Sequence, residues 1–223
     1  MRFPHAAKGV KKIFSAEILS LIASLLAGGI SIAAVFGAAA INTDNEVGAF
    51  ISGGVVVLLG VAALTLLVFG GIINVIGYIQ ASMDEKGFKR AIICTIVSII
   101  LAIASSFMMN QTGFLGWLGT GLYAASRIFS LLVVLFSIGG LINLSAECNR
   151  EDMIVKGNNI LKVIVAVYVL AILAMFFSRV FQASAFSVTL TGILSIAALV
   201  LTVVEYFLYL SFLAKASRML NEN

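Results

Sequence analysis

Charged residues are scarce in this sequence. They account for 11% of the 223 residues, whereas an average soluble protein has about 25%. Apolar residues account for 61%, and the mean hydropathy is +1.14. A water-soluble fold of this length cannot bury so many apolar side chains. The composition therefore excludes an ordinary soluble domain and indicates an integral membrane protein.

Proline and strand-like alternation are nearly absent as well. The chain contains one Pro. Few segments alternate between apolar and polar residues over about 10 positions, as the strands of a membrane barrel do. Inside a bilayer, only helices and closed barrels satisfy all backbone hydrogen-bonding groups. We therefore predict an all-α fold.

Residues that build catalytic and metal sites are rare. The chain has one His and two Cys, and Cys94 and Cys148 are isolated from each other and from the His. The sequence therefore offers no CxxC pair and no Cys–His metal cluster. Nucleophile-elbow, P-loop and zinc-protease motifs are absent too. We expect a protein with no enzyme activity and no cofactor.

Six apolar segments, separated by short polar ones, dominate the chain. Each is long enough for the roughly 20 residues that a membrane span requires. They run approximately over residues 13–41, 48–80, 91–109, 114–146, 160–178 and 186–214. Short connections keep consecutive antiparallel helices adjacent. We therefore predict one compact six-helix transmembrane domain over residues 13–223, with helices paired first with second, third with fourth and fifth with sixth.

The basic residues indicate the orientation of these helices. Lys and Arg resist translocation across a membrane, whereas acidic residues have little influence. Twelve of the 14 basic residues fall on the side that holds both chain ends, namely Arg2, Lys8, Lys11, Lys12, Lys86, Lys89, Arg90, Arg150, Lys156, Lys162, Lys215 and Arg218. We expect both termini in the cytoplasm of a multi-pass cell-membrane protein, and we favour a bacterial inner membrane.

The net charge of +4 belongs to these membrane edges and not to one domain face. It therefore does not indicate nucleic-acid binding. The expected partner is the lipid bilayer, with anionic lipid at the cytoplasmic face. Self-association, or association with a partner membrane subunit, is left open. Residues 1–12 place Lys8 and Lys12 at helical spacing, which predicts a short basic amphipathic arm on the membrane surface.

An internal repeat links the second and fourth segments. The stretch FGGIINVIGY at 69–78 aligns with IGGLINLSAE at 138–147, and this alignment pairs Asn74 with Asn143. Parallel repeats of this kind build some transporters. The alternative is that helical hairpins with basic cytoplasmic ends resemble one another by constraint alone.

The sixth segment joins this repeat less clearly. If ASM at 81–83 matches ASR at 216–218, Glu205 takes the place of Gly70, and Tyr209 takes the place of Asn74. The chain then consists of three tandem hairpins with the same orientation. They cover approximately residues 13–80, 88–146 and 158–216.

The fourth segment is longer than a membrane requires. Its roughly 33 residues would rise about 50 Å as one helix, against a bilayer core of about 30 Å. We expect residues 113–126, which contain four glycines, to form an interfacial or re-entrant lead-in with Trp117 and Tyr123 at headgroup level. Arg127 then snorkels to the outer interface, which Arg179 also anchors. The alternative places Arg127 on a substrate path.

Glu205 is the polar residue that calls most for an explanation. It lies 11 residues before Ala216, about 16 Å of helix from the cytoplasmic end and close to the midplane. A charged carboxylate there costs at least about 2.5 kcal/mol, so it should be protonated, paired or in contact with water or protein. We predict that Glu205 faces a substrate or ion path inside the bundle. The other candidate residues for this path are Asn74, Asn143, Tyr168, Tyr209 and Thr202. Glu17 lies near an interface, and we expect no special role for it.

Two functions remain open. In the first, the protein is transporter- or channel-like and moves a small solute or ion, with Glu205 binding a proton or cation. In the second, it is a non-catalytic scaffold, accessory or immunity subunit that binds a partner protein, and Glu205 is a protonated hydrogen-bonding group between helices. Short loops weaken the second function, and scarce intramembrane charge weakens the first. The residues favour transport.

Overall fold

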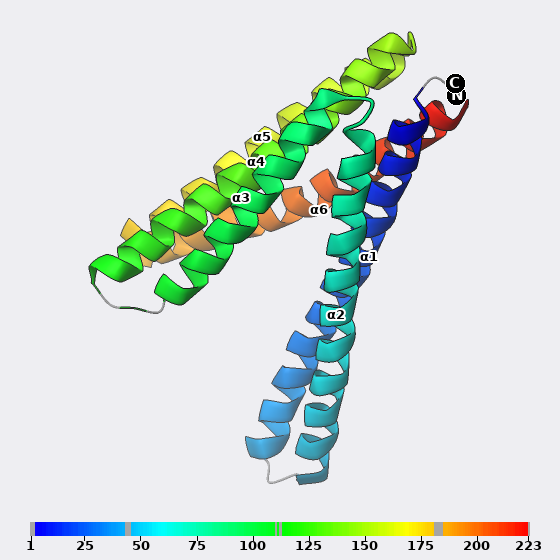
Figure 1. Cartoon of the computed structure of the whole chain (residues 1–223). Helices are drawn as coiled ribbons and strands as arrows, with labels where there is room; N and C mark the ends of the chain where they lie inside the picture. Colours follow the sequence, from blue (N-terminus) through cyan, green and yellow to red (C-terminus); the bar gives the residue numbers. More distant parts are fainter. Residues whose placement is uncertain (1–2, 43–45, 110, 112, 181–184, 223) are drawn as a thin grey trace.

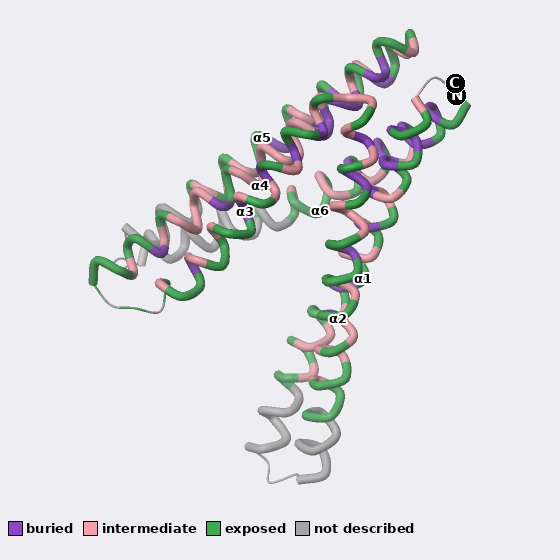
Figure 2. Tube along the Cα trace, in the orientation of Figure 1, coloured by how far each residue is buried: buried purple, intermediate pink, exposed green. Residues whose placement is uncertain are grey.

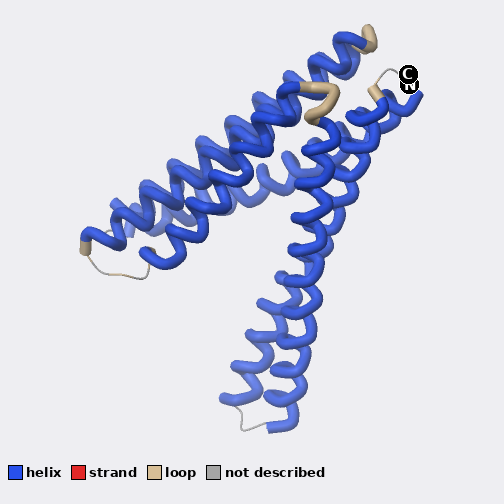
Figure 3. Tube along the Cα trace, in the orientation of Figure 1, coloured by secondary structure: helices blue, strands red, loops and turns tan. Residues whose placement is uncertain are grey.

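The structure, a computed structural model, describes residues 3–42, 46–109, 111, 113–180 and 185–222, and their side chains except at 36–42, 46–52, 174–180, 185–196, 198 and 199. Within these residues every regular element is an α-helix (Figure 3). The helices are α1 (Pro4–Asn42), α2 (Glu46–Ala81), α3 (Lys86–Met108), α4 (Phe114–Glu147), α5 (Glu151–Val180) and α6 (Ala185–Glu222). All six are long and apolar enough to cross a membrane, with mean hydropathies from 1.4 to 2.7. The predicted all-α fold with six candidate spans is confirmed.

The helices form two arms that diverge from a common end (Figure 1). One arm consists of α1 packed along α2, and the other contains α3, α4 and α5. Helix α6 contacts both α5 and α1, so it joins the two arms. The two chain ends lie side by side at the common end.

This arrangement is more open than the compact bundle that the sequence predicts. Helix α2 contacts α3 far less than it contacts α1. On the α1–α2 arm, Leu25, Val57 and Leu58 remain 67–71% exposed within the chain. Lipid tails are as apolar as these side chains, so helices in a membrane gain little free energy by burying apolar faces against each other. The arms therefore need not close.

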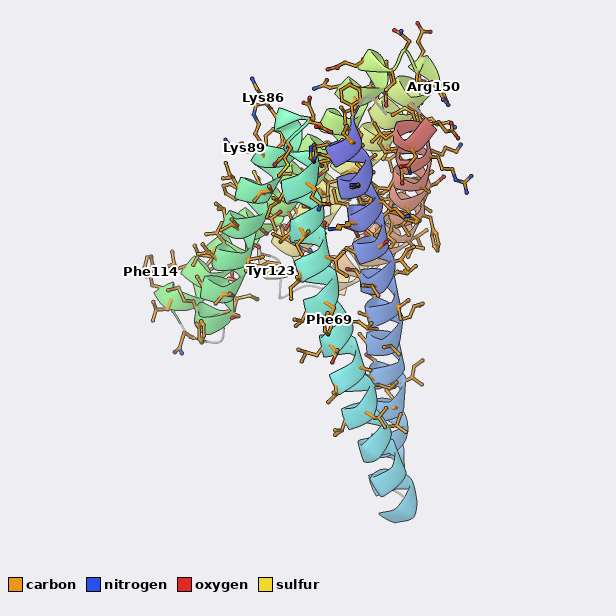
Figure 4. All side chains as sticks on the ribbon, turned by 45° about the vertical axis from the view of Figure 1, so that its right-hand side comes forward. Phe69, Lys86, Lys89, Phe114, Tyr123 and Arg150 are labelled. Atoms are coloured by element: carbon orange, nitrogen blue, oxygen red, sulfur yellow. The ribbon has the colours of Figure 1, made fainter. Side chains whose placement is uncertain are left out.

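The core of the molecule lies at the common end, where Figure 2 shows most of the buried residues. All six helices contribute fully or almost fully buried side chains there, including Val10, Ala81, Phe88, Leu141, Met153 and Phe212. Figure 4 places Lys86, Lys89 and Arg150 at this same end. The apolar core thus sits next to the basic edge of the molecule.

Serine hydroxyl groups connect α3 to α4. The Ser98 hydroxyl oxygen is 3.1 Å from the Ser126 carbonyl oxygen and 2.8 Å from the Ser130 hydroxyl oxygen. The Ser126 hydroxyl in turn donates to the Ser98 carbonyl oxygen at 3.2 Å. Interhelical hydrogen bonds of this kind contribute about 0.6 kcal/mol each in membranes. They fix the register of α4, which carries part of the site described below.

Helix α1 begins at Pro4, and its first turn is capped from the turn that joins α2 to α3. Pro at the first helical position loses no hydrogen bond, because its N–H would have no partner. The Ala6 N–H donates to Asp84 Oδ2 at 2.7 Å, and the carboxylate also complements the helix dipole. Residues 4–12, expected as a separate arm on the membrane surface, are instead the first turns of α1. Ala6 and Val10 are fully buried there.

Helix α4 is continuous from Phe114 to Glu147, so residues 114–126 belong to one long helix and the expected re-entrant lead-in is wrong. The placement of Trp117 and Tyr123 at headgroup level stays a prediction. The helix starts after Gly113, whose φ of 71° favours glycine. A Cβ atom on Gly119 would lie 2.7 Å from the backbone nitrogen of Met109. This glycine therefore allows α4 to pack closely against the end of α3, and it does not interrupt the helix.

Candidate functional site

A cavity of about 410 Å³ opens between α1, α4, α5 and α6. Its lining residues are Glu17 of α1, Tyr123, Arg127 and Val134 of α4, Val167, Tyr168, Ala171 and Ile172 of α5, and Thr202, Glu205, Tyr206 and Tyr209 of α6. Four of the residues predicted for a substrate path are therefore brought together, from two helices. The cavity also contains two charged side chains, Glu17 and Arg127. The sequence gives Glu17 no place on that path, and it places Arg127 there only as the alternative to an interface anchor.

Glu205 lines this cavity from α6 and is half-buried. Tyr168 of α5 lies close enough to interact with it electrostatically. Within the described residues, the carboxylate has no ion pair and no hydrogen bond to another side chain. A carboxylate in a membrane-spanning helix is costly unless it contacts water, protein or a ligand. The cavity supplies that contact.

Glu17 provides a second carboxylate, from α1. The Tyr206 hydroxyl donates to the main-chain carbonyl oxygen of Glu17, and it lies 3.3 Å from Glu17 Oε2. Asn74 approaches the same carboxylate from α2. The Asn74 amide oxygen is buried without a hydrogen-bond partner in the described part of the chain. Helices α1, α2 and α6 thus meet around one carboxylate.

Arg127 brings a positive charge to the α4 wall of the cavity. Its guanidinium carbon lies 5.6 Å from the centre of the Tyr123 ring, a cation–π geometry. Tyr123 is labelled on α4 in Figure 4. The described residues contain no ion pair between Arg127 and either carboxylate of the cavity. The predicted role of Arg127 as an anchor at the outer interface is not tested, but its side chain faces the cavity.

Tyr209 also lines the cavity and is 5% exposed. It neighbours Tyr78 of α2, whose hydroxyl oxygen is 3.0 Å from that of Ser137 on α4. The Tyr209 hydroxyl is buried close to that of Tyr78, but it forms no hydrogen bond of good geometry in the described part of the chain. A buried hydroxyl of this kind leaves a donor available to a ligand or a water molecule.

The remaining predicted residues lie elsewhere. The Asn143 amide nitrogen donates to Glu85 Oε1 at 3.1 Å, near the common end, and Asn143 is not part of the cavity lining. Trp117 is 68% exposed on the first turns of α4, at the opposite end of that helix. Arg179 belongs to the last turn of α5, but its side chain lies outside the described residues.

Sequence reasoning missed Glu17 and Tyr206. Glu17 is assigned to an interface because the first span is taken to begin at residue 13, whereas α1 begins at Pro4. Counted from Pro4, Glu17 lies about 20 Å along the helix. It also shares a helical face with the fully buried Val10 and Ile13. That extended apolar stripe is the signal that could have placed Glu17 inside the molecule.

The cavity is suited to binding a small, positively charged group. Two carboxylates oppose one guanidinium, which leaves an excess of negative charge when all three are ionised. Tyr168, Tyr206 and Tyr209 also line the cavity, and aromatic rings attract cations. No group of three His, Cys, Asp or Glu side chains that could hold a metal ion occurs in the described residues. The arrangement therefore fits a proton or an organic cation better than a tightly coordinated divalent ion.

Comparison of the chain with protein-family models, with curated proteins and with solved structures gives no match. Function is therefore inferred from the cavity and from the helices that build it.

Proposed function

We propose that this protein is a transporter-like membrane protein that moves a proton or a small organic cation through the cavity between its arms. It acts without enzyme chemistry and without a cofactor. Glu205 binds the cation, and Glu17 provides a second negative charge from the α1 wall of the cavity. Tyr168 and Tyr209 line the route, whereas Asn143 does not belong to it.

One observation carries this proposal. Glu205 is a half-buried carboxylate, without an ion pair in the described residues, on the wall of a 410 Å³ cavity among membrane-spanning helices. Ionisable residues inside membrane spans usually face substrate or ion pathways, because a purely structural role does not offset their desolvation. A glue role would instead require a hydrogen-bond partner, and none is found for Glu205 among the described side chains.

Charge movement in proteoliposomes tests the proposal. The purified full chain is reconstituted, and currents are recorded on a solid-supported membrane with protons, Na⁺, K⁺ and tetramethylammonium as probes. We expect a current for at least one probe. Glu205→Gln should lower its initial rate at least about tenfold, because it removes a charge-assisted interaction worth about 1.5–3 kcal/mol.

Glu151→Gln is the matched control, since Glu151 is an exposed carboxylate on the first turn of α5. It should leave the current unchanged. If no probe gives a current above that of protein-free liposomes, or if Glu205→Gln behaves like the wild type, the proposal fails.

We also propose that the chain consists of three tandem hairpins with both termini in the cytoplasm. A glycine near the start of each odd-numbered helix supports this. Gly9 packs against α2 at Gly77, Gly87 packs against α4 at Gly140, and Gly157 packs against Phe212 of α6 as well as against Ile142 of α4. Gly77 and Gly140 are 63 positions apart, whereas the alignment of residues 69–78 with 138–147 pairs residues that are 69 positions apart. The contact with Phe212 preserves the spacing of 135 that matches Ala81 with Ala216.

This register explains the position of Asn143. With a spacing of 63, Asn143 corresponds to Gln80, and Ser137 takes the place opposite Asn74. Asn74, Ser137 and Tyr209 then occupy equivalent positions in the three hairpins. The contacts of Tyr78 with both Ser137 and Tyr209 support that equivalence. Asn143 falls nearly two turns closer to the common end.

A scaffold, accessory or immunity subunit is the second candidate function. One observation favours it, namely that the α1–α2 arm exposes apolar side chains such as Leu25, Val57 and Leu58 over much of its described length. A second copy or a partner membrane subunit would find a helical surface there. Under this function Glu205→Gln leaves the partner complex and the stability of the protein intact, so the same variant separates the two candidates.

A further inference from the structure

A second cavity of about 250 Å³ lies where α5 and α6 run side by side. Lys156 of α5 and Lys215 of α6 stand at its mouth, near the common end of the molecule. Its walls continue along both helices as an apolar groove formed by Ile160, Val163, Leu208 and Phe212. The cavity is therefore charged at one end and mostly apolar along the rest, where Asn159 and Ser211 are its other polar lining residues.

The two lysines form an unusual pair. Both are exposed, and their ammonium groups are close enough to interact with each other. Neither forms an ion pair in the described part of the chain. The nearest carboxylate, that of Asp152, is one turn from Lys156, but it is paired with Arg150 at 3.2 Å. Two neighbouring positive charges repel each other, and an anion placed between them removes that repulsion.

The apolar part of the groove runs along α5 and α6, away from the two lysines, as an acyl chain runs away from its headgroup. Lys156 and Val163 are seven residues apart on α5, and Lys215 and Leu208 are seven residues apart on α6, so both walls run about 10 Å away from the charged mouth. The floor includes Phe212, which is 2% exposed and packs against Gly157. The groove thus leads from the basic edge of the molecule into the membrane-spanning region.

We propose that this groove binds an anionic phospholipid, with its phosphate between Lys156 and Lys215 and an acyl chain along the apolar walls. Asn159 and Ser211, which also line the groove, offer hydrogen bonds to the glycerol and headgroup oxygens. Basic pockets between membrane helices are known to hold such headgroups. The site is separate from the large cavity, so it does not depend on the proposed transport.

Lipid titration of the full chain in detergent, followed by native mass spectrometry, tests the site. Phosphatidylglycerol should bind in preference to phosphatidylcholine. The double variant Lys156→Gln/Lys215→Gln should weaken phosphatidylglycerol binding about thirtyfold, because each lysine near an anionic headgroup contributes about a factor of five. Binding of phosphatidylcholine should not change.

Lys86→Gln/Lys89→Gln is the matched control. It removes two positive charges from the same end of the molecule, where Figure 4 shows both side chains projecting outward from α3. It should leave phosphatidylglycerol binding intact. An equal loss in this control would mean diffuse attraction to the basic edge and would overturn the site.

The apolar half of the proposal has its own test. Val163→Phe fills the groove without changing a charge, and it should lower phosphatidylglycerol binding while elution on size exclusion stays that of the wild type. If Val163→Phe does not fold, Leu208→Phe on the opposite wall serves as the test variant instead. Glycerol phosphate, which lacks acyl chains, should bind much more weakly than phosphatidylglycerol. If it binds equally well, the groove is a free-anion site and the proposal is wrong.

Discussion

Tyr206 is the residue that joins α6 to α1 beside the large cavity. Its hydroxyl reaches the main chain and the carboxylate of Glu17, so it connects the helix that joins the two arms to the α1–α2 arm. This hydrogen bond matters for the geometry of the cavity, because few other polar contacts connect α1 to α6 in the described residues. It holds the two carboxylates of the cavity on walls with a fixed relative position.

Tyr206→Phe should therefore lower the free energy of unfolding by about 0.6 kcal/mol and at most about 1.7 kcal/mol, the range of hydrogen bonds between membrane helices. Thermal unfolding of the protein in one detergent would measure the change. Tyr123→Phe is the control, because the Tyr123 ring contacts Arg127 while its hydroxyl has no hydrogen bond in the described residues. A control that loses as much stability as Tyr206→Phe would contradict the assigned role.

The sequence identifies part of this site because of one strong local signal. A carboxylate in the apolar stretch around Glu205 is costly in lipid, and helical spacing and depth then point to Tyr168, Tyr209 and Thr202. Glu17 gives a weaker signal, namely the apolar stripe that it shares with Val10 and Ile13, and the basic residues next to it indicate a membrane edge. Its place in the site depends on the packing of α1 against α6, which is a contact between the two ends of the chain.

Among the elements, α1 and α2 make the closest approach, at Gly9. A Cβ atom at this position would lie 2.5 Å from both the Gly77 carbonyl oxygen and the Ala81 nitrogen. Backbone atoms cannot move aside as a flexible side chain can. The absence of a side chain on Gly9 is therefore what allows the start of α1 to pack along the end of α2, as small residues do in many membrane helix pairs.

Gly9→Ala should consequently destabilise the protein by about 1–3 kcal/mol, the usual cost of overpacking. Gly71→Ala provides the comparison, because a Cβ there meets nothing within 4 Å. It should be neutral or stabilising by up to about 1 kcal/mol, since Ala favours helix over Gly. Unfolding of both variants in the same detergent gives the two values. Similar losses in the two variants would refute the close-packing account.

The helices themselves follow closely from the sequence, because long apolar runs in a membrane have few alternatives. The exceptions are the start of α1, which lies at Pro4 and not near residue 13, and the start of α4, where the glycines of residues 113–126 predict a lead-in separate from the helix that follows. Composition records that glycine weakens a helix, but it cannot show that Gly119 faces the backbone at the end of α3. Such a contact depends on two helices meeting, which a local pattern does not contain.

At the scale of the whole molecule, the basic residues and both chain ends lie at the same end. The common end holds both chain ends, the core and the labelled basic residues Lys86, Lys89 and Arg150 (Figures 1 and 4). Since basic residues are retained on the cytoplasmic side, that end should face the cytoplasm. The divergence of the arms was not predictable, because it reflects how little free energy membrane helices gain from additional apolar contact.

Cysteine labelling tests this orientation. Cys94 and Cys148 are first replaced by Ser, and single cysteines are then placed at Asn42 and Asn158. Asn42 is the last residue of α1, with its side chain outside the described residues, and Asn158 is exposed near the start of α5. A membrane-impermeant maleimide should label position 158 only after the cells are opened, and position 42 without opening them. The reverse pattern would invert the topology.

The capping of α1 by Asp84 has a consequence for the timing of synthesis. Asp84 follows Ala6 by 78 positions, and ribosomes add about 5–20 residues per second, so the cap is missing for roughly 4–16 s after Ala6 is made. During that interval the first turn of α1 has neither its carboxylate nor the end of α2 to pack against. We expect Lys8, Lys11 and Lys12 to hold it on the anionic surface of the membrane. The surface-bound arm indicated by residues 1–12 would then describe the nascent chain, and the buried first turns of α1 the finished protein.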